Sequence, residues 1–107
     1  MSDALIVFVP DPTSADGERI GEVLVGERLA ACVNVLGPVR SIYRWQGEVC
    51  RDDEHLLMIK STRARYATLE ARVKALHTYD VPEVVALPIE MGSAAYLDWI
   101  ESMTADE

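Results

Sequence analysis

His77 is the residue best suited to bind a metal ion, because two carboxylates follow it closely. The segment His77–Glu83 reads His-Thr-Tyr-Asp-Val-Pro-Glu, which places Asp80 and Glu83 on the same short connection. An imidazole combined with carboxylates is a mixed nitrogen and oxygen ligand set, which suits copper or zinc. The alternative is a structural histidine at the end of a helix, hydrogen-bonded and stabilised there when its ring is positive. Both interpretations remain open.

Signatures of catalysis are missing from the sequence. It contains no Cys-x-x-Cys and no His-x-x-x-His, and the segment from Gly21 to Gly26 lacks the lysine and hydroxyl of a nucleotide-binding loop. Cys32 and His77 would be a possible nucleophile and base, but their surroundings do not resemble a thiol enzyme. Cys32 is better explained as a small buried hydrophobic residue. We therefore predict that the protein is not an enzyme.

A long β-hairpin is predicted between Ala31 and Ser61. Val, Ile, Tyr and Trp are frequent in this stretch, and Gln46-Gly47 suits a two-residue turn that needs positive φ. Such a turn predicts cross-strand pairs, which are Trp45 with Glu48, Tyr43 with Cys50, Arg40 with Asp53, and Leu36 with Leu57. Gly37-Pro38 and Asp52-Asp53 interrupt the alternation, so we expect a bulge or bend near them.

The tip of this hairpin carries three residue types that are frequent at interfaces, namely Tyr43, Arg44 and Trp45. An arm of about 14 residues gives a hairpin of ~45 Å. A compact chain of this length is only ~35 Å across, so the tip should reach beyond its own domain. We expect the three residues to form an interface with a neighbouring subunit; a platform for a ligand is the alternative.

The other segments predict a mixed α/β (α+β) fold in one domain, residues 1–107. An apolar strand over Ala4–Val9 precedes a helix capped by Thr13, which extends to about Leu29. After the hairpin, a helix capped by Ser61 or Thr62 has an apolar stripe, and a strand over 84–89 and a short helix close the chain. The order β-α-β-β-α-β with a C-terminal helix is that of a ferredoxin-like split βαβ sandwich.

The base of the hairpin indicates association with another copy of the chain. Leu56–Ile59 is apolar without interruption, which is typical of a strand covered on both faces. Two helices can cover only one face of a small sheet. We therefore expect a second copy of the chain to cover the other face, in a closed oligomer.

Composition limits the partners and the compartment. Asp and Glu outnumber Lys and Arg by 18 to 10, giving a formal net charge of −8, which argues against a nucleic-acid partner. No apolar run is long enough to cross a bilayer, and Asp3 stands where a signal peptide would be basic. Cys32 and Cys50 lie far apart in the predicted hairpin, so we expect free thiols in the cytoplasm.

Three motifs resemble those of the CutA divalent-cation-tolerance family. They are Arg-Leu-Ala-Ala-Cys-Val-Asn at 28–34, Ser-Ile-Tyr-Arg-Trp-Gln-Gly at 41–47 and His-Thr-Tyr-Asp-Val-Pro-Glu-Val at 77–84. The resemblance covers nearly the whole chain and includes Tyr96, Leu97 and Trp99. It implies a cytoplasmic homotrimer with a role in tolerance of metals such as copper, and no enzymatic activity.

The family also resembles PII signalling trimers in architecture, which gives a second hypothesis. In it the trimer is a signalling or adaptor module that binds a small metabolite or a protein partner in clefts between subunits. The residues expected to line such a cleft are Tyr43, Trp45, Lys60, Tyr79 and Trp99.

The sequence departs from the family at the proposed copper ligands. Some members have a cysteine at the end of the first strand and a His-His pair before the Pro-Tyr. This chain has Val9, then Leu76 and His77, with Thr78 in place of the usual proline. One ligand of the set is therefore retained, and the resemblance predicts weak binding of copper or another divalent cation.

Overall fold

The computed structural model describes residues 2–106, and its elements follow the predicted order. They are β1 (Ala4–Asp11), α1 (Ser14–Gly26), β2 (Cys32–Trp45), β3 (Glu48–Thr62), α2 (Arg63–Leu76), β4 (Val85–Pro88) and α3 (Ala94–Thr104). All strand pairs are antiparallel, in the order β2-β3-β1-β4. Because β3 lies between β2 and β1, the chain has the predicted ferredoxin-like arrangement with an added C-terminal helix.

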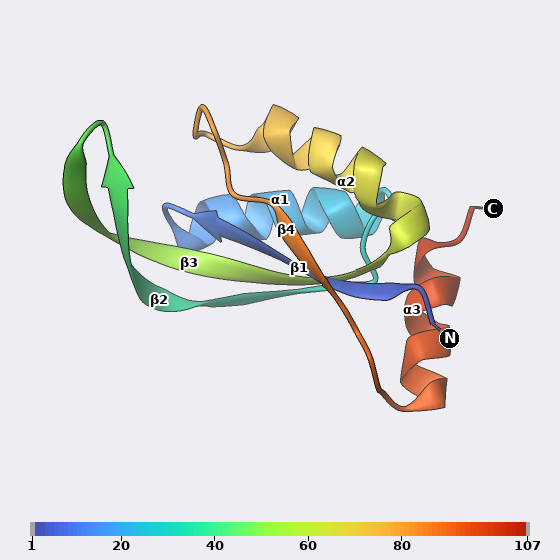
Figure 1. Ribbon diagram of the computed structural model, residues 1–107. Helices are drawn as coiled ribbons and strands as arrows, with labels where there is room; N and C mark the ends of the chain where they lie inside the picture. The colour runs from blue at the N-terminus through green and yellow to red at the C-terminus, as the bar shows by residue number, and fades with distance from the viewer. Residues whose placement is uncertain (1, 107) are drawn as a thin grey trace.

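Helices α1 and α2 lie on the same face of the sheet (Figure 1). The main core forms between them and the sheet, from alternate residues of β1 and β3 and from the inner stripes of the helices. Its fully buried members are Val7, Val9, Ile20, Leu24, Leu57, Ile59, Leu69 and Val73. This alternation in the strands and the 3.6-residue spacing in the helices are the patterns that the sequence displays.

Helix α1 begins at the predicted cap and ends earlier than predicted. The Thr13 Oγ1 accepts a hydrogen bond from the Asp16 N–H at 3.1 Å, as a cap should. The expected extension to Leu29 is wrong, because Arg28 takes a positive φ of 62° and the Leu29 and Ala30 N–H groups both turn back to Leu24 O. The helix therefore stops at Gly26.

Strand β1 continues two residues beyond the predicted end at Val9. Pro10 pairs with Leu56, and Asp11 pairs with His55. Proline is tolerated here because β4 pairs only with Leu5–Phe8, so that this end of β1 has a single neighbouring strand. The alternation that buries Val7 and Val9 thus continues to Asp11, whose side chain is fully buried.

The hairpin has the predicted turn and the predicted register near its tip. Gln46 and Gly47 have φ values of 50° and 81°, as a two-residue turn with two positive φ angles requires. Trp45 pairs with Glu48, Tyr43 with Cys50, and Arg40 with Asp53. The last pair is a salt bridge, with 2.7 Å between Arg40 Nε and Asp53 Oδ1.

A bulge at Gly37-Pro38 changes the register at the base of the hairpin. Leu36 pairs with Leu56, so the prediction that it faces Leu57 is wrong by one residue. The bulge itself was predicted, and it accounts for the shift, because two residues of β2 lie opposite His55 alone. A Cβ atom on Gly37 would lie 2.6 Å from the His55 Cδ2, so only glycine fits. Beyond the bulge the ribbon curls toward the helix-bearing side of the sheet (Figure 1).

The face of the sheet opposite α1 and α2 is apolar and mostly uncovered. Helix α3 packs on one end of it, where Ile100 meets Ala4 and Ala31. The rest of the face is formed by half-buried and exposed residues of all four strands, namely Ile6, Phe8, Pro10, Cys32, Asn34, Leu36, Leu56, Met58, Lys60, Val85 and Leu87. We call this set the open sheet face.

Candidate functional site

The imidazole of His77 is buried at the junction of β1 and α2. Its Nε2 lies 2.7 Å from the Pro10 carbonyl oxygen and 3.2 Å from Asp11 Oδ1. Its Nδ1 accepts a hydrogen bond from the Tyr79 N–H at 3.1 Å. Because Nδ1 accepts, the proton of the neutral ring is on Nε2, which donates to Pro10. Both ring nitrogens are therefore engaged within the chain.

Asp11 is a buried carboxylate with little compensation. Neither of its oxygens has a hydrogen-bond partner among the described residues. His77 Nε2 is within ion-pair distance, but its N–H is directed at the Pro10 carbonyl, so the contact is not a hydrogen bond. Burial raises the pKa of the Asp11 carboxyl from 3.8 to about 6, and the electrostatic interaction with the neighbouring imidazole of His77 opposes part of that increase.

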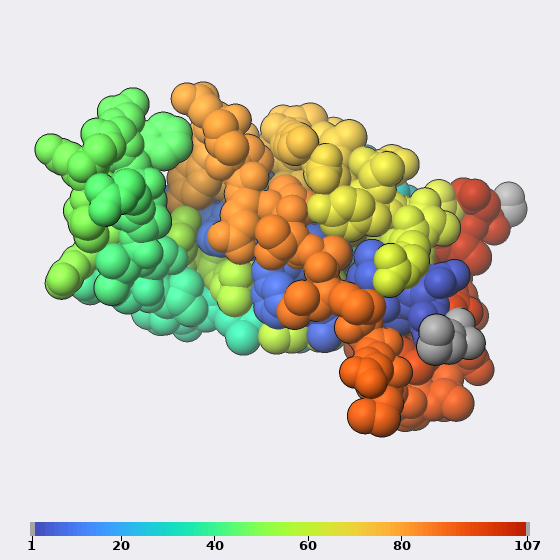
Figure 2. All heavy atoms as spheres, in the orientation of Figure 1, coloured from blue at the N-terminus to red at the C-terminus, as the bar shows by residue number. Residues whose placement is uncertain are grey.

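One tyrosine joins this junction to the distal hairpin, and a second lies within the hairpin itself. The Tyr79 hydroxyl donates to Glu54 Oε2 at 2.7 Å, and the Tyr43 hydroxyl donates to Asp52 Oδ2. Burial and the bond to Glu54 raise the pKa of Tyr79, while the bond to Asp52 raises the pKa of Tyr43 to about 12. Figure 2 shows the distal hairpin (green) against the segment between α2 and β4 (orange).

The predicted metal ligands His77, Asp80 and Glu83 are not gathered by the structure. Asp80 and Glu83 lie exposed on the connection after α2, whereas the ring of His77 is turned inward. The carboxylate beside His77 is Asp11, because the end of β1 passes beneath the histidine ring. Across residues 2–106, no group of three or more His, Cys, Asp or Glu side chains is arranged to hold a metal ion.

The predicted cleft residues occupy three separate regions of the chain. Tyr43 and Tyr79 form one region, in which Tyr43 bonds to Asp52 and Tyr79 bonds to Glu54. Trp45 lies at the turn and is half exposed. On the open sheet face, the Lys60 Nζ donates to Asn34 Oδ1. On α3, Trp99 lies beside Tyr96 with 5.5 Å between ring centroids. A common cleft thus requires an assembly, and both it and an interface of Tyr43, Arg44 and Trp45 stay predictions.

Asp11 and Glu54 are the residues of this junction that sequence analysis did not identify. Asp11 continues the alternation that turns every second residue of β1 toward the core, so this period predicts a buried side chain at Asp11. Pro10 and Pro12 on either side suggest instead that the strand has already ended. Glu54 is buried next to the bulge, where the alternation is broken, and no local pattern marks it.

The fold and the long hairpin define a class of protein, the ferredoxin-like α+β domains with an extended β2–β3 ribbon. The sequence model of the family described as CutA1 divalent ion tolerance protein matches residues 5–103. The chain therefore belongs to the CutA1 divalent ion tolerance family.

Individual relatives agree with this assignment. The divalent-cation tolerance protein CutA of Thermus thermophilus is 50% identical over 99 residues, 92% of this chain and 96% of that protein. A solved structure of the T. thermophilus Cut A1 protein has a TM-score of 0.93 at 49% identity, covering 95% of this chain and 99% of that chain. Chloroplastic CutA 1 of Oryza sativa is 42% identical over 96% of this chain, which spans 58% of that longer protein.

The family and its T. thermophilus member are both named for tolerance of divalent cations. Relatives differ in compartment, since the rice relative is called chloroplastic and a solved relative from Archaeoglobus fulgidus is called periplasmic. The described part of this chain has no helix that is long and apolar enough to cross a membrane.

Proposed function

We propose that the protein contributes to tolerance of divalent cations as a closed homotrimer. The open sheet face is the observation that supports a closed assembly. One row across it runs through Asn34, Met58, Phe8 and Val85 of four adjacent strands. Leu87 at its edge is 57% exposed. A bare apolar face of this extent is an aggregation hazard unless another surface covers it, and a closed ring of copies provides that cover.

The hairpin supplies the second element of the proposed assembly. Beyond His55, β3 has no pairing with β1, so the distal ribbon is covered by little of its own chain. Ile42 and Val49 on one side of it are 62% and 65% exposed, and Trp45 is 50% exposed. In the proposed trimer these side chains pack on a neighbouring subunit. The number three follows from the family resemblance, whereas the physical argument requires only closure.

The mass in solution tests this proposal. Light scattering at micromolar concentration should give three times the chain mass of 11.9 kDa. Truncation of an interface anchor costs about 2–4 kcal/mol, so Trp45→Ala should lower the thermal midpoint of the trimer. A wild-type mass near one chain would contradict the architecture. A Trp45→Ala trimer with an unchanged midpoint would remove Trp45 as an anchor and favour a ligand contact at the tip.

For the cation itself we propose weak binding, with His77 as the retained ligand. Both ring nitrogens are engaged, so a metal ion must displace the contact with Pro10 or the bond from Tyr79. We expect copper to bind with a Kd in the micromolar range or weaker, roughly −8 kcal/mol. Binding needs the neutral imidazole and should weaken as the pH falls below about 6.

Calorimetric titration with Cu²⁺ separates this site from adventitious binding. His77→Ala should abolish the heat of binding, whereas His55→Ala, which removes the other histidine, should leave it unchanged. Circular dichroism checks that both variants remain folded. Tight binding that survives His77→Ala would refute the assignment.

We also place the protein in a reducing compartment, the cytoplasm. Cys32 and Cys50 are both free thiols, at opposite ends of β2 and β3, and neither takes part in a disulfide. Free, partly accessible cysteines are typical of such compartments.

A further inference from the structure

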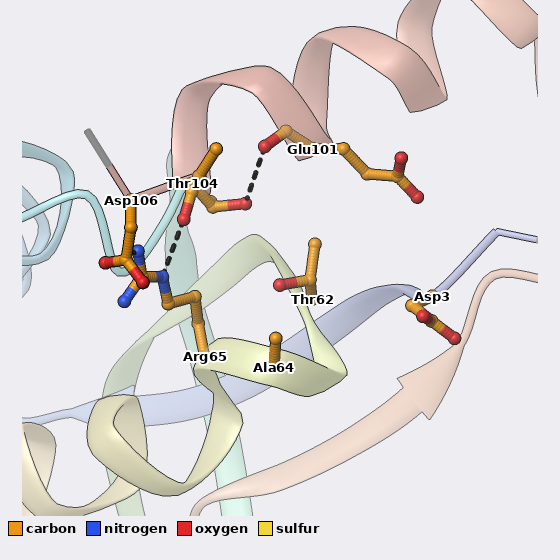
Figure 3. A pocket seen from close by; sticks show the side chains of 8 residues that line it. Asp3, Thr62, Ala64, Arg65, Glu101, Thr104 and Asp106 are labelled. Carbon is orange, nitrogen blue, oxygen red and sulfur yellow. Dashed lines mark hydrogen bonds and ion pairs between the residues drawn. The ribbon is translucent and has the colours of Figure 1, made fainter.

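A cavity of about 300 Å³ lies between the start of α2 and the end of α3, away from the junction at His77. Figure 3 shows it with Thr62 and Ala64 on one side and Thr104 on the other. The N-terminus of α2, which is the positive end of its dipole, therefore forms one wall of the cavity. The carbonyl end of α3 forms the opposite wall.

The start of α2 directs unused hydrogen-bond donors at this cavity. The first N–H groups of a helix have no partner within it. Arg63 N–H donates to the Asp3 carbonyl at 3.0 Å, but the hydroxyl of Thr62, at the cap position, makes no hydrogen bond to the first turn. Thr62 is only 6% exposed, and its hydroxyl has no partner among the described residues. That hydroxyl points into the cavity (Figure 3).

Arg65 adds a positive charge to the same wall. Its Nε donates to the Thr104 carbonyl at 2.6 Å, which fixes the guanidinium beside the end of α3. Its Nη2 pairs with the carboxylate of Asp106, which is 89% exposed on the tail of the chain. The Asp106 carboxylate lies next to the guanidinium at the edge of the cavity. This position therefore has room for a negatively charged group with two or more oxygens.

Two further carboxylates line the cavity and limit the affinity for an anion. The side chains of Asp3 and Glu101 contribute to its wall. In Figure 3 both extend away from the Thr62 hydroxyl, toward the side opposite Arg65. Their charges repel an anion, but their side chains do not occupy the donors, so an anion that binds here depends on direct hydrogen bonds.

We propose that this cavity binds a small oxyanion of the phosphate type. Its oxygens accept hydrogen bonds from the Thr62 hydroxyl and from the N–H groups of Ala64 and Arg65, the usual way in which a helix N-terminus holds phosphate. The Arg65 guanidinium binds it in exchange for Asp106. The chain thus carries an anion site that is separate from the site of cation tolerance and does not depend on it.

Titration of the ¹⁵N-labelled protein with inorganic phosphate, at constant ionic strength, tests the proposal by NMR. We expect saturable shifts of the Ala64 and Arg65 amide signals in the millimolar range, about 4 kcal/mol of binding free energy. The signals of the distal hairpin should not move. Failure of the two amides to shift, or equal shifts over the whole protein, would overturn the proposal.

Variants at the cavity assign the donors. Thr62→Val keeps the shape and removes the hydroxyl, so phosphate should bind about threefold to tenfold more weakly. Asp106→Asn removes the competing carboxylate and should strengthen binding severalfold. Arg63→Gln is the matched control, since it removes a positive charge from the same turn but outside the cavity. If Arg63→Gln and Thr62→Val weaken phosphate binding equally, the effect comes from the general charge of the surface, and the proposed site is refuted.

A comparison of ligands identifies the source of the oxyanion. Because the cavity is larger than a phosphate ion, a phosphate monoester such as phenyl phosphate can also enter. Equal affinity for the ester and inorganic phosphate supports a site for the oxyanion alone, and tighter binding of the ester supports a phosphorylated small molecule. Both results require the Ala64 and Arg65 shifts.

Discussion

Phe8→Glu is expected to separate the proposed trimer into single folded chains. Phe8 lies in the middle of the open sheet face, paired with Met58 on one side and Val85 on the other. A carboxylate buried there would lose its hydration without gaining a partner, which costs several kcal/mol at each interface. In the separated chain the same side chain faces water, so the fold itself should survive.

Light scattering combined with circular dichroism distinguishes dissociation from unfolding. Dissociation lowers the mass toward 11.9 kDa with the helical signal retained. Ala71→Glu is the matched control, because it adds the same charge at an exposed position of α2. This helix lies on the other face of the sheet, away from the open sheet face. An unchanged mass for Phe8→Glu would mean that the open sheet face is not the interface.

Asp11→Asn is expected to make the protein more stable at neutral pH. The pKa of Asp11 is about 6 in the folded protein and 3.8 as its ordinary value. Between these values the folded state holds a proton that the unfolded state has released, so wild-type stability falls as the pH rises through this window. Two pKa units correspond to about 3 kcal/mol, and an amide does not undergo this loss.

Urea denaturation at pH 4 and at pH 7, at one protein concentration, measures the effect. The free energy of unfolding of Asp11→Asn relative to wild type should rise by about 2.5 kcal/mol between the two pH values, because the unfolded-state carboxyl is already partly ionised at pH 4. Asp98→Asn removes an exposed carboxylate of α3 and serves as the control. If the difference in free energy of unfolding between Asp11→Asn and wild type does not change with pH, the Asp11 carboxyl is better solvated or hydrogen-bonded than the structure indicates.

Local patterns in the sequence were sufficient to predict most of the fold. Gln46-Gly47 determined the turn, and the turn determined the register as far as Arg40 and Asp53, because pairing in an antiparallel ribbon follows from its loop. The pairing of Leu36 failed, since the bulge adds one residue whose effect on register depends on the fit of Gly37 against His55.

The surroundings of His77 were beyond the reach of local patterns. Pro10, whose carbonyl oxygen contacts its ring, lies 67 residues away in the sequence, and nothing in the motif around His77 specifies that neighbour. Asp80 and Glu83 are close to His77 in sequence, and for that reason the motif alone predicts them as its partners. The chain direction after α2 instead turns the ring toward β1.

The bulge at Gly37 and the bond between Tyr79 and Glu54 together make the distal hairpin a lever arm. Glu54 lies beside the bulge, where the ribbon leaves β1, and the turn at Gly47 lies at the far end. About seven residues of strand separate the two points, an arm of roughly 25 Å. A tilt of ten degrees at the base would thus displace the turn by about 4 Å on the same strand geometry. On this geometry a small rearrangement of the connection that carries Tyr79 would produce a larger displacement at Trp45.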